Sequence, residues 1–187
     1  KLTEDTIVIY TADQGYWLGQ HGFYDKRLIL ETSMRMPFLI RYPRMIKPGS
    51  VSKDLCINID LAPTLLELAG LKAPAAMQGR SMVSLLQGKS PTDWRQSQFY
   101  SYWGAPNHYG IRTKRYTYLK LEGHPAELFD RETDPDQVHN VAANTENKAV
   151  VKRLEKELLK QIREVDIRQD ELPSSSKDKE KKKNPRR

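Results

Sequence analysis

Apolar and polar residues alternate with two different periods in the first half of the chain. Short apolar runs of strand type lie at residues 6–12 and 38–42, and stretches of helical spacing lie at residues 27–35, 61–69 and 82–86. An unbroken run such as Ile7, Val8 and Ile9 is typical of a strand that is buried on both faces, so we expect residues 6–12 to form a central, parallel strand. This half of the chain therefore predicts an α/β arrangement.

The helix predicted at residues 61–69 has clear signals at both ends. Asp60 is a good N-cap, and Pro63 fits the first helical turn, where a missing amide hydrogen costs nothing. Gly70 is a suitable C-terminal stop because glycine adopts the left-handed conformation that ends many helices. Gly88 follows residues 82–86 in the same way.

Beyond residue 95 the pattern changes to short segments rich in aromatic and β-branched residues. These predict strands at residues 98–103, 108–113, 116–121 and 127–129. Lys114 and Arg115 lie at the position of a hairpin turn. Apolar residues then recur every three or four positions across residues 147–166, which predicts an amphipathic helix that packs across the small sheet.

The positive charge of the chain is concentrated at its end. The 187 residues carry a net charge of +7, and residues 171–187 alone contribute +4. Such a segment buries too little apolar surface to fold by itself. It either attaches to an anionic polymer or is a solvated tail, and the absence of aromatic residues favours the solvated tail over a nucleic-acid site.

Several classes of protein do not fit the sequence. The single cysteine, Cys56, excludes an intrachain disulfide, and its apolar neighbours indicate a buried, inert thiol. No run approaches the roughly 18 apolar residues of a membrane span, and no signal peptide opens the chain. Without an initiating methionine, the sequence begins as though it were taken from within a longer protein.

Residues 11–26 carry the strongest chemical signal. Asp13 and Gln14 follow the first predicted strand, at the end where open α/β sheets bind ligands. Their oxygens suit a hard cation such as Ca²⁺ or Mg²⁺. His21 and Lys26, in the same glycine-rich stretch, supply donors for an anion. A cation site beside an anion site predicts chemistry on a sulfate or phosphate ester.

This stretch resembles the second metal-binding segment of the type I sulfatases, which belong to the alkaline-phosphatase-like superfamily. The similarity extends over roughly residues 5–165 and includes several shorter motifs in the same order. They are Thr11–Gly15, Leu18–Gly22, Asp25-Lys26, Arg35–Pro37, Asp60–Leu65, Gly79–Ser81, Gly110–Thr113, Glu127–Asp130, Asp134-Pro135 and Asn140. The resemblance implies the C-terminal part of an alkaline-phosphatase-like mixed sheet flanked by helices, followed by a small α+β subdomain with an antiparallel sheet and one long helix.

The resemblance also implies roles for individual residues. Asp13 and Gln14 would be metal ligands, with Ca²⁺ favoured over Mg²⁺, although the family more often has His or Asn at the position of Gln14. Lys26 would contact the sulfate and balance the charge that moves onto its oxygens during catalysis. His21 would either act on the ester as a donor or general acid, or hold the glycine-rich loop through a backbone bond. His108 is a candidate for substrate binding.

The family nucleophile is a formylglycine made from Cys or Ser in a Cys/Ser-x-Pro-x-Arg motif. Neither Cys56 nor Ser90 lies in such a motif. We therefore expect this chain to be inactive alone, with the nucleophile and the other metal ligands supplied by a preceding segment. The expected organisation is a catalytic α/β part at residues 1–95, a small antiparallel sheet and helix at residues 96–168, and a disordered basic tail at residues 169–187.

The predicted function is a sulfuric ester hydrolase that acts on a sulfated small molecule or glycan. Two alternatives remain open, namely a phosphodiesterase or phosphonate monoester hydrolase of the same superfamily, and a non-catalytic sulfatase-like module that binds acidic glycans. The family implies an exported enzyme, whether periplasmic, extracellular or lysosomal.

Overall fold

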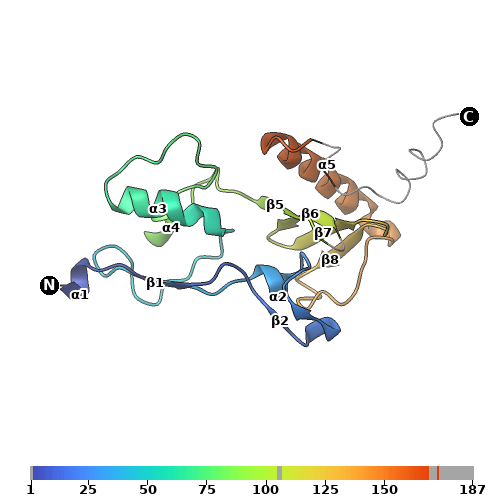
Figure 1. Cartoon of the computed structure of the whole chain (residues 1–187), viewed down its shortest axis with the longest axis horizontal. Helices are drawn as coiled ribbons and strands as arrows, with labels where there is room; N and C mark the ends of the chain where they lie inside the picture. Colours follow the sequence, from blue (N-terminus) through green and yellow to red (C-terminus); the bar gives the residue numbers. More distant parts are fainter. Residues whose placement is uncertain (1, 105–106, 169–171, 173–187) are drawn as a thin grey trace, which may run out of the picture. The chain divides into compact units, whose positions relative to one another are not determined.

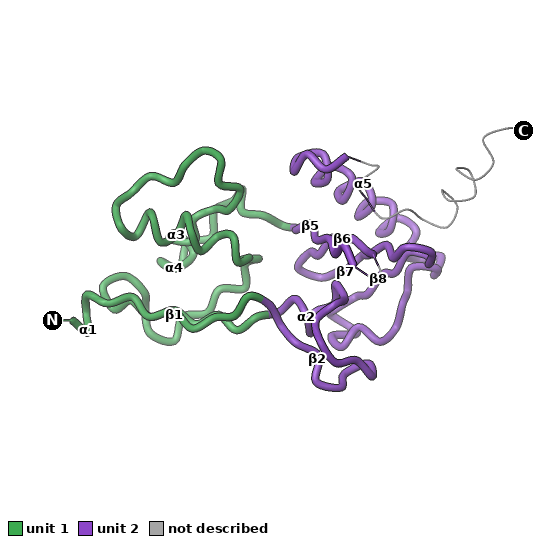
Figure 2. Tube along the Cα trace, in the orientation of Figure 1, with its two compact units in different colours: residues 1–13, 36–96 green, residues 14–35, 97–187 purple. Residues whose placement is uncertain are grey.

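The computed structural model describes residues 2–104, 107–168 and 172, and the chain folds into two compact units. Unit 1 comprises residues 1–13 and 36–96, and unit 2 comprises residues 14–35 and 97–187 (Figure 2). Residues 14–35, here called the motif segment, thus fold with the C-terminal part of the chain. The three-part organisation expected from the sequence remains a prediction, and its basic tail, residues 169–187, lies outside the described residues except for Leu172.

The described residues of unit 1 form six short elements. They are α1 (Leu2–Asp5), β1 (Val8–Thr11), β4 (Phe38–Arg41), η2 (Asn58–Asp60), α3 (Leu61–Leu68) and α4 (Val83–Leu86). The sequence predicted four of them, namely β1, β4, α3 and α4. Gly70 and Gly88 follow α3 and α4 with φ angles of 74° and 78°. Glycine adopts this left-handed conformation without the penalty of a Cβ atom, so both predicted helix stops are confirmed.

The prediction that the first strand is central and parallel is wrong for the described residues. β1 pairs with β4 in an antiparallel, two-stranded sheet, with Val8 opposite Arg41 and Tyr10 opposite Leu39. Val8 and Tyr10 are 53% and 64% exposed. A run of β-branched residues predicts extended backbone, but it does not determine the direction of the neighbouring strand.

The core of unit 1 lies around α3 and α4. Met82, Leu85 and Trp94 are buried together, and the half-buried Cys56 packs against them. Burial, assisted by the charge of Asp60, raises the pKa of the Cys56 thiol to about 11. Because the thiolate is the reactive form, the raised pKa favours the predicted inert thiol, although Cys56 is half-buried rather than fully buried.

Asp60 has a different role from the predicted N-cap. Its side chain makes no capping bond to α3 and is fully buried. The carboxylate instead accepts bonds from the amides of Ile57 (2.9 Å) and Arg80 (2.8 Å) and from both terminal nitrogens of Arg95. Asp60 therefore joins three separate segments of unit 1.

Unit 2 is built on a four-stranded antiparallel sheet. Its strands, in spatial order, are β5 (Ser97–Tyr102), β6 (His108–Thr113), β7 (Tyr116–Leu121) and β8 (Glu127–Asp130). The remaining elements are β2 (Trp17–Leu18), η1 (Gln20–Gly22), β3 (Tyr24–Asp25), α2 (Glu31–Met34), η3 (Thr145–Asn147) and α5 (Lys148–Glu164). The predicted antiparallel sheet and long helix are thus confirmed.

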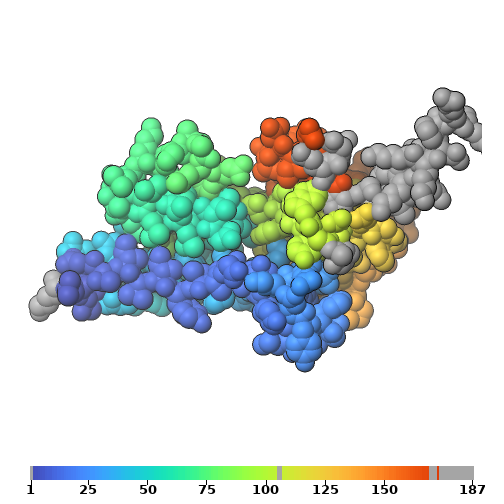
Figure 3. All heavy atoms as spheres, in the orientation of Figure 1, coloured from blue at the N-terminus to red at the C-terminus, as the bar shows by residue number. Residues whose placement is uncertain are grey.

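Different parts of the chain pack against the two faces of this sheet (Figure 1). On one face, Leu154, Leu158 and Ile162 of α5 pack with Ile111 and Tyr118. Neighbouring residues of a strand point to opposite faces, so Leu119 lies on the other side of the sheet. There the motif segment covers the sheet, and the space-filling view shows its blue atoms directly against the yellow-green strands (Figure 3).

The helix predicted at residues 27–35 is limited to α2, Glu31–Met34. The expectation is wrong for residues 27–30 because tertiary contacts take their backbone groups. The amide of Ile29, for example, donates to the side chain of His108 in β6. None of the helices in the described ranges has the length and apolar character needed to cross a membrane.

Candidate functional site

The motif segment folds as a small hairpin followed by a tight return to the sheet. β2 and β3 pair antiparallel, and η1 closes the hairpin between them. Just before the hairpin, Gly15 brings the segment close to α2, since its amide donates to the carbonyl of Ser33 at 2.8 Å. A Cβ atom at Gly15 would lie 2.1 Å from the carbonyl oxygen of Thr32, so only glycine fits there.

Gln14 is tied to Lys26 across the mouth of the hairpin. The Gln14 amide nitrogen Nε2 donates to the Lys26 carbonyl at 3.1 Å. The atom of Gln14 suited to a cation is therefore Oε1, and Asp13, the preceding residue in the chain, has a carboxylate. These hard oxygens match the ligands that Ca²⁺ prefers. Within the described ranges no group of three or more His, Cys, Asp or Glu side chains is arranged to hold a metal.

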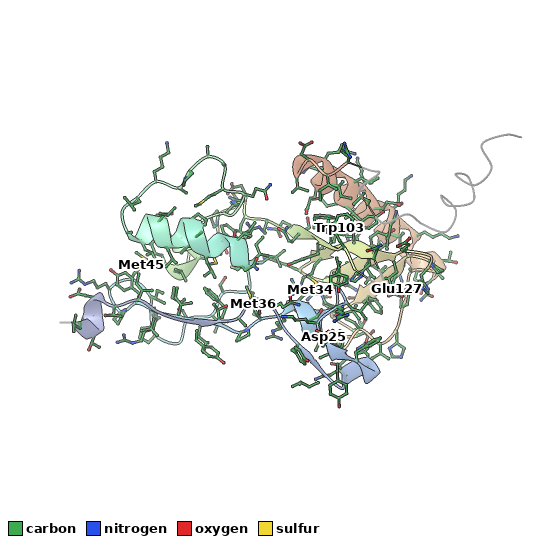
Figure 4. All side chains as sticks on the ribbon, viewed as in Figure 1. Asp25, Met34, Met36, Met45, Trp103 and Glu127 are labelled. Carbon is green, nitrogen blue, oxygen red and sulfur yellow. The ribbon has the colours of Figure 1, made fainter. Side chains whose placement is uncertain are left out.

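Lys26 lies in a constrained loop with its side chain exposed. The preceding residue, Asp25, has a φ of 91°, which is rare for a residue other than glycine. Its carboxylate accepts a 2.6 Å bond from Nε of Arg27. The side chains of Gln14, Asp25 and Arg27 thus hold the backbone on both sides of Lys26. Asp25 is labelled in Figure 4.

His21 contacts the C-terminal part of unit 2. Its Nε2 lies 2.6 Å from the carbonyl oxygen of Asp136, and because a carbonyl only accepts, Nε2 is the donor. The ring also meets the buried Trp17 edge-on, with centroids 5.1 Å apart. This bond corresponds to the second of the two roles that the sequence left open, while a role for His21 in catalysis stays a prediction.

His108 is fully buried beneath the motif segment. Its Nε2 accepts the amide hydrogen of Ile29 at 3.1 Å, and its ring lies 5.3 Å from that of Tyr102. This bond requires Nε2 to be unprotonated. The structure therefore shows His108 as a support for the loop after Lys26, and substrate binding by His108 stays a prediction.

A partly buried ion cluster anchors the start of α2, and sequence reasoning missed it. Arg112 donates through Nε and Nη2 to the Glu31 carboxylate at 2.9 and 2.8 Å, and Arg131 lies 3.4 Å from the same carboxylate. Helical spacing placed Arg35 nearby, but the two arginines from the sheet provide the contacts. The only sequence signal was the position of Arg112 within the Gly110–Thr113 motif.

The Glu31 cluster is expected to make unit 2 less stable in acid. Burial acts to raise the pKa of Glu31, but the hydrogen bonds and charge of Arg112, with the charge of Arg131, outweigh it and lower that pKa below its usual value of 4.5. A lowered pKa stabilises the fold above the unfolded-state value, and this contribution disappears as pH falls through the folded-state value.

We therefore expect the stability of the chain to decrease as the pH is lowered below about 4.5, and Glu31→Gln to flatten this part of the profile. Urea unfolding monitored by circular dichroism between pH 3 and 7 measures the effect. Glu164→Gln, which alters an exposed ion pair with Lys160 on α5, is the matched control. An unchanged slope in Glu31→Gln would contradict the assignment.

Comparisons with known sequences identify relatives that are named as sulfatases. The family model "N-sulphoglucosamine sulphohydrolase, C-terminal" matches residues 19–164. An N-acetylglucosamine-6-O-sulfatase from Bacteroides thetaiotaomicron is 39% identical over 171 residues, which is 86% of this chain and 30% of that protein. The chain thus spans about a third of the length of the curated relatives that it matches.

Solved structures agree with the sequence relatives. A structure described as a complex with its substrate D-glucosamine-2-N,6-O-disulfate aligns with a TM-score of 0.82 and 37% identity, covering 86% of this chain and 34% of that one. A phosphonate monoester hydrolase from Silicibacter pomeroyi aligns with a TM-score of 0.75 and 29% identity, covering 86% and 35%. The predicted α/β fold of the alkaline-phosphatase-like type is thereby confirmed.

Proposed function

The chain belongs to the sulfatase family, as a domain of the N-sulphoglucosamine sulphohydrolase C-terminal type, and from this premise we propose that it forms part of a sulfuric ester hydrolase acting on a sulfated carbohydrate. The observation that carries the proposal is the 0.82 TM-score to the structure bound to a disulfated glucosamine. The 39% identity to an N-acetylglucosamine-6-O-sulfatase supports an amino sugar as the substrate class. Membership of the family also supports an exported location.

In this proposal Lys26 binds the sulfate group through its ammonium. Sulfur–oxygen cleavage shifts negative charge onto the oxygens of the ester, and a fixed cation at that position stabilises the transition state more than the ground state. The ties from Gln14 to the Lys26 carbonyl and from Arg27 to Asp25 support this role because they limit the movement of the loop. His21 and His108 fix the loop from the sheet side.

Asp13 and the Oε1 atom of Gln14 would hold a divalent cation, with Ca²⁺ favoured over Mg²⁺ because Ca²⁺ accepts more oxygen ligands in a less rigid geometry. The bound ion would supply Lewis-acid polarisation of the sulfate oxygens, and a formylglycine outside this chain would supply the nucleophile. The contribution of these 187 residues is therefore to bind and orient the sulfate group.

The phosphonate monoester hydrolase that aligns with 29% identity supports a second candidate function. The two proposals differ in the central atom of the ester. In a complete enzyme that carries this chain, we expect kcat/KM for an aryl sulfate to exceed that for the matched aryl phosphonate monoester and aryl phosphodiester by at least about a hundredfold.

This comparison uses the same aryl leaving group in all three substrates, so differences in leaving-group chemistry cancel. The 187-residue chain alone is the control, and we expect it to turn over none of them. A preference for the phosphonate or the phosphodiester would reject the sulfatase proposal in favour of the second candidate.

A further inference from the structure

The turn after β8 is tightly organised by its own polar groups. The Asp134 carboxylate accepts bonds from the amides of Val138 at 3.2 Å and His139 at 2.8 Å. The amide of Gln137 donates to the Asp134 carbonyl at 3.0 Å. These bonds fix the position of Asp136 and Gln137 relative to the sheet.

This turn contacts the motif segment on both sides of Lys26. The Asp136 carbonyl accepts the 2.6 Å bond from His21, five residues before Lys26. The Oε1 atom of Gln137 accepts a 2.5 Å bond from the amide of Glu31, five residues after Lys26. Two consecutive residues of the turn thus span the loop that carries the lysine.

Packing alone does not explain a glutamine at position 137. Its side chain is only 2% exposed, and its backbone φ of 56° costs a residue other than glycine roughly 1 kcal/mol. Its Nε2 is buried without a hydrogen-bond partner, which is a further cost. The compensating interaction is the bond from Oε1 to the Glu31 amide, which starts α2.

We propose that Asp136 and Gln137 form a clamp on the Lys26 loop, with Gln137 as a positioning residue for catalysis. The inference rests on the proposed role of Lys26 in binding sulfate. Gln137 lies beneath the loop and acts through the backbone of Glu31, as His108 does through the backbone of Ile29. Releasing one side of the loop would displace Lys26 from the charge that develops in the transition state, so the effect should fall on kcat rather than KM.

The test is Gln137→Met, which keeps the length of the side chain and removes the acceptor. In a complete enzyme that carries this chain, we expect kcat for an aryl sulfate to fall at least about tenfold while KM changes less than about twofold. In a Lys26→Ala background the same substitution should change kcat less than about twofold, because the group that it positions is absent. An equal loss of kcat in both backgrounds would overturn the proposal.

A matched control is Gln161→Met on α5, which also removes a hydrogen-bonded glutamine from unit 2 but lies on the opposite face of the sheet. It should leave kcat unchanged. If Gln137→Met does not fold, Gln137→Asn replaces it, since asparagine tolerates the left-handed backbone and its shorter side chain withdraws the acceptor. An equal kcat in Gln137→Met or Gln137→Asn and in Gln161→Met would also overturn the proposal.

Hydrogen exchange of the 187-residue chain separates failure of the clamp from failure of the proposed function. Gln137→Met should speed exchange of the Glu31 amide at least about tenfold without changing amides in α5. Unchanged exchange at Glu31 rejects the clamp. If exchange rises but Lys26→Ala keeps full activity on the aryl sulfate, the clamp exists and the proposed role of Lys26 is wrong.

Discussion

Replacing Asp60 with alanine is expected to lower the free energy of unfolding of the chain by about 4 kcal/mol. The Asp60 side chain is fully buried and accepts bonds from the amides of Ile57 and Arg80. It also pairs with Arg95, whose side chain is 11% exposed. The substitution leaves a buried guanidinium without its counter-ion and two amides without an acceptor, and each of these losses is costly.

Urea unfolding monitored by circular dichroism measures this loss. The matched control is Asp93→Ala, because the Asp93 carboxylate pairs with Arg80 but is 76% exposed. Exposed ion pairs contribute little, so we expect the control to lose less than about 1 kcal/mol. Equal losses in the two variants would show that the buried carboxylate is not what joins the segments of unit 1.

Replacing Lys26 with alanine is expected to lower kcat for a sulfate ester by about 10² to 10³, in a complete enzyme that carries this chain. The ammonium of Lys26 is the charge that the proposed mechanism places against the sulfate oxygens. Removing it should affect kcat more than KM if it acts on charge developing in the transition state. Steady-state kinetics with an aryl sulfate measure both values.

Lys72→Ala is the matched control for this experiment, because Lys72 is an exposed lysine of unit 1. We expect its kcat to remain within twofold of the parent enzyme. The melting temperatures of Lys26→Ala and of the control, measured alongside, separate a loss of catalysis from a loss of folding. An active Lys26→Ala variant would mean that another group neutralises the sulfate.

The parts of the fold that follow from local periodicity were predictable from the sequence. α5 and the hairpin of β6 and β7 have strong patterns, and the structure places them within a few residues of the prediction. The orientation of β1 and the length of α2 were not predictable in the same way. Both depend on partners that are distant in the sequence, namely the strand that pairs with β1 and the side chain that takes the Ile29 amide.

The candidate site was also predictable only in part. The residue types in the motif segment indicate an anion and a cation, and the resemblance to sulfatases names Asp13, Gln14, Lys26 and His21. The supports of the loop could not be inferred, because Arg112 and Gln137 are 81 and 106 residues from their partner Glu31. No pattern in a single sequence links positions that far apart.

The packing of the motif segment against the C-terminal sheet has a consequence for synthesis on the ribosome. Lys26 emerges 111 residues before Gln137, so its loop leaves the ribosome long before the sheet that supports it. At typical rates of about 5–20 residues per second this interval is roughly 5–20 seconds. Until β6 emerges the loop has none of its sheet contacts, and the contacts of Asp136 and Gln137 form last, so a nascent chain halted before β6 would leave Lys26 open to cleavage by trypsin-like proteases.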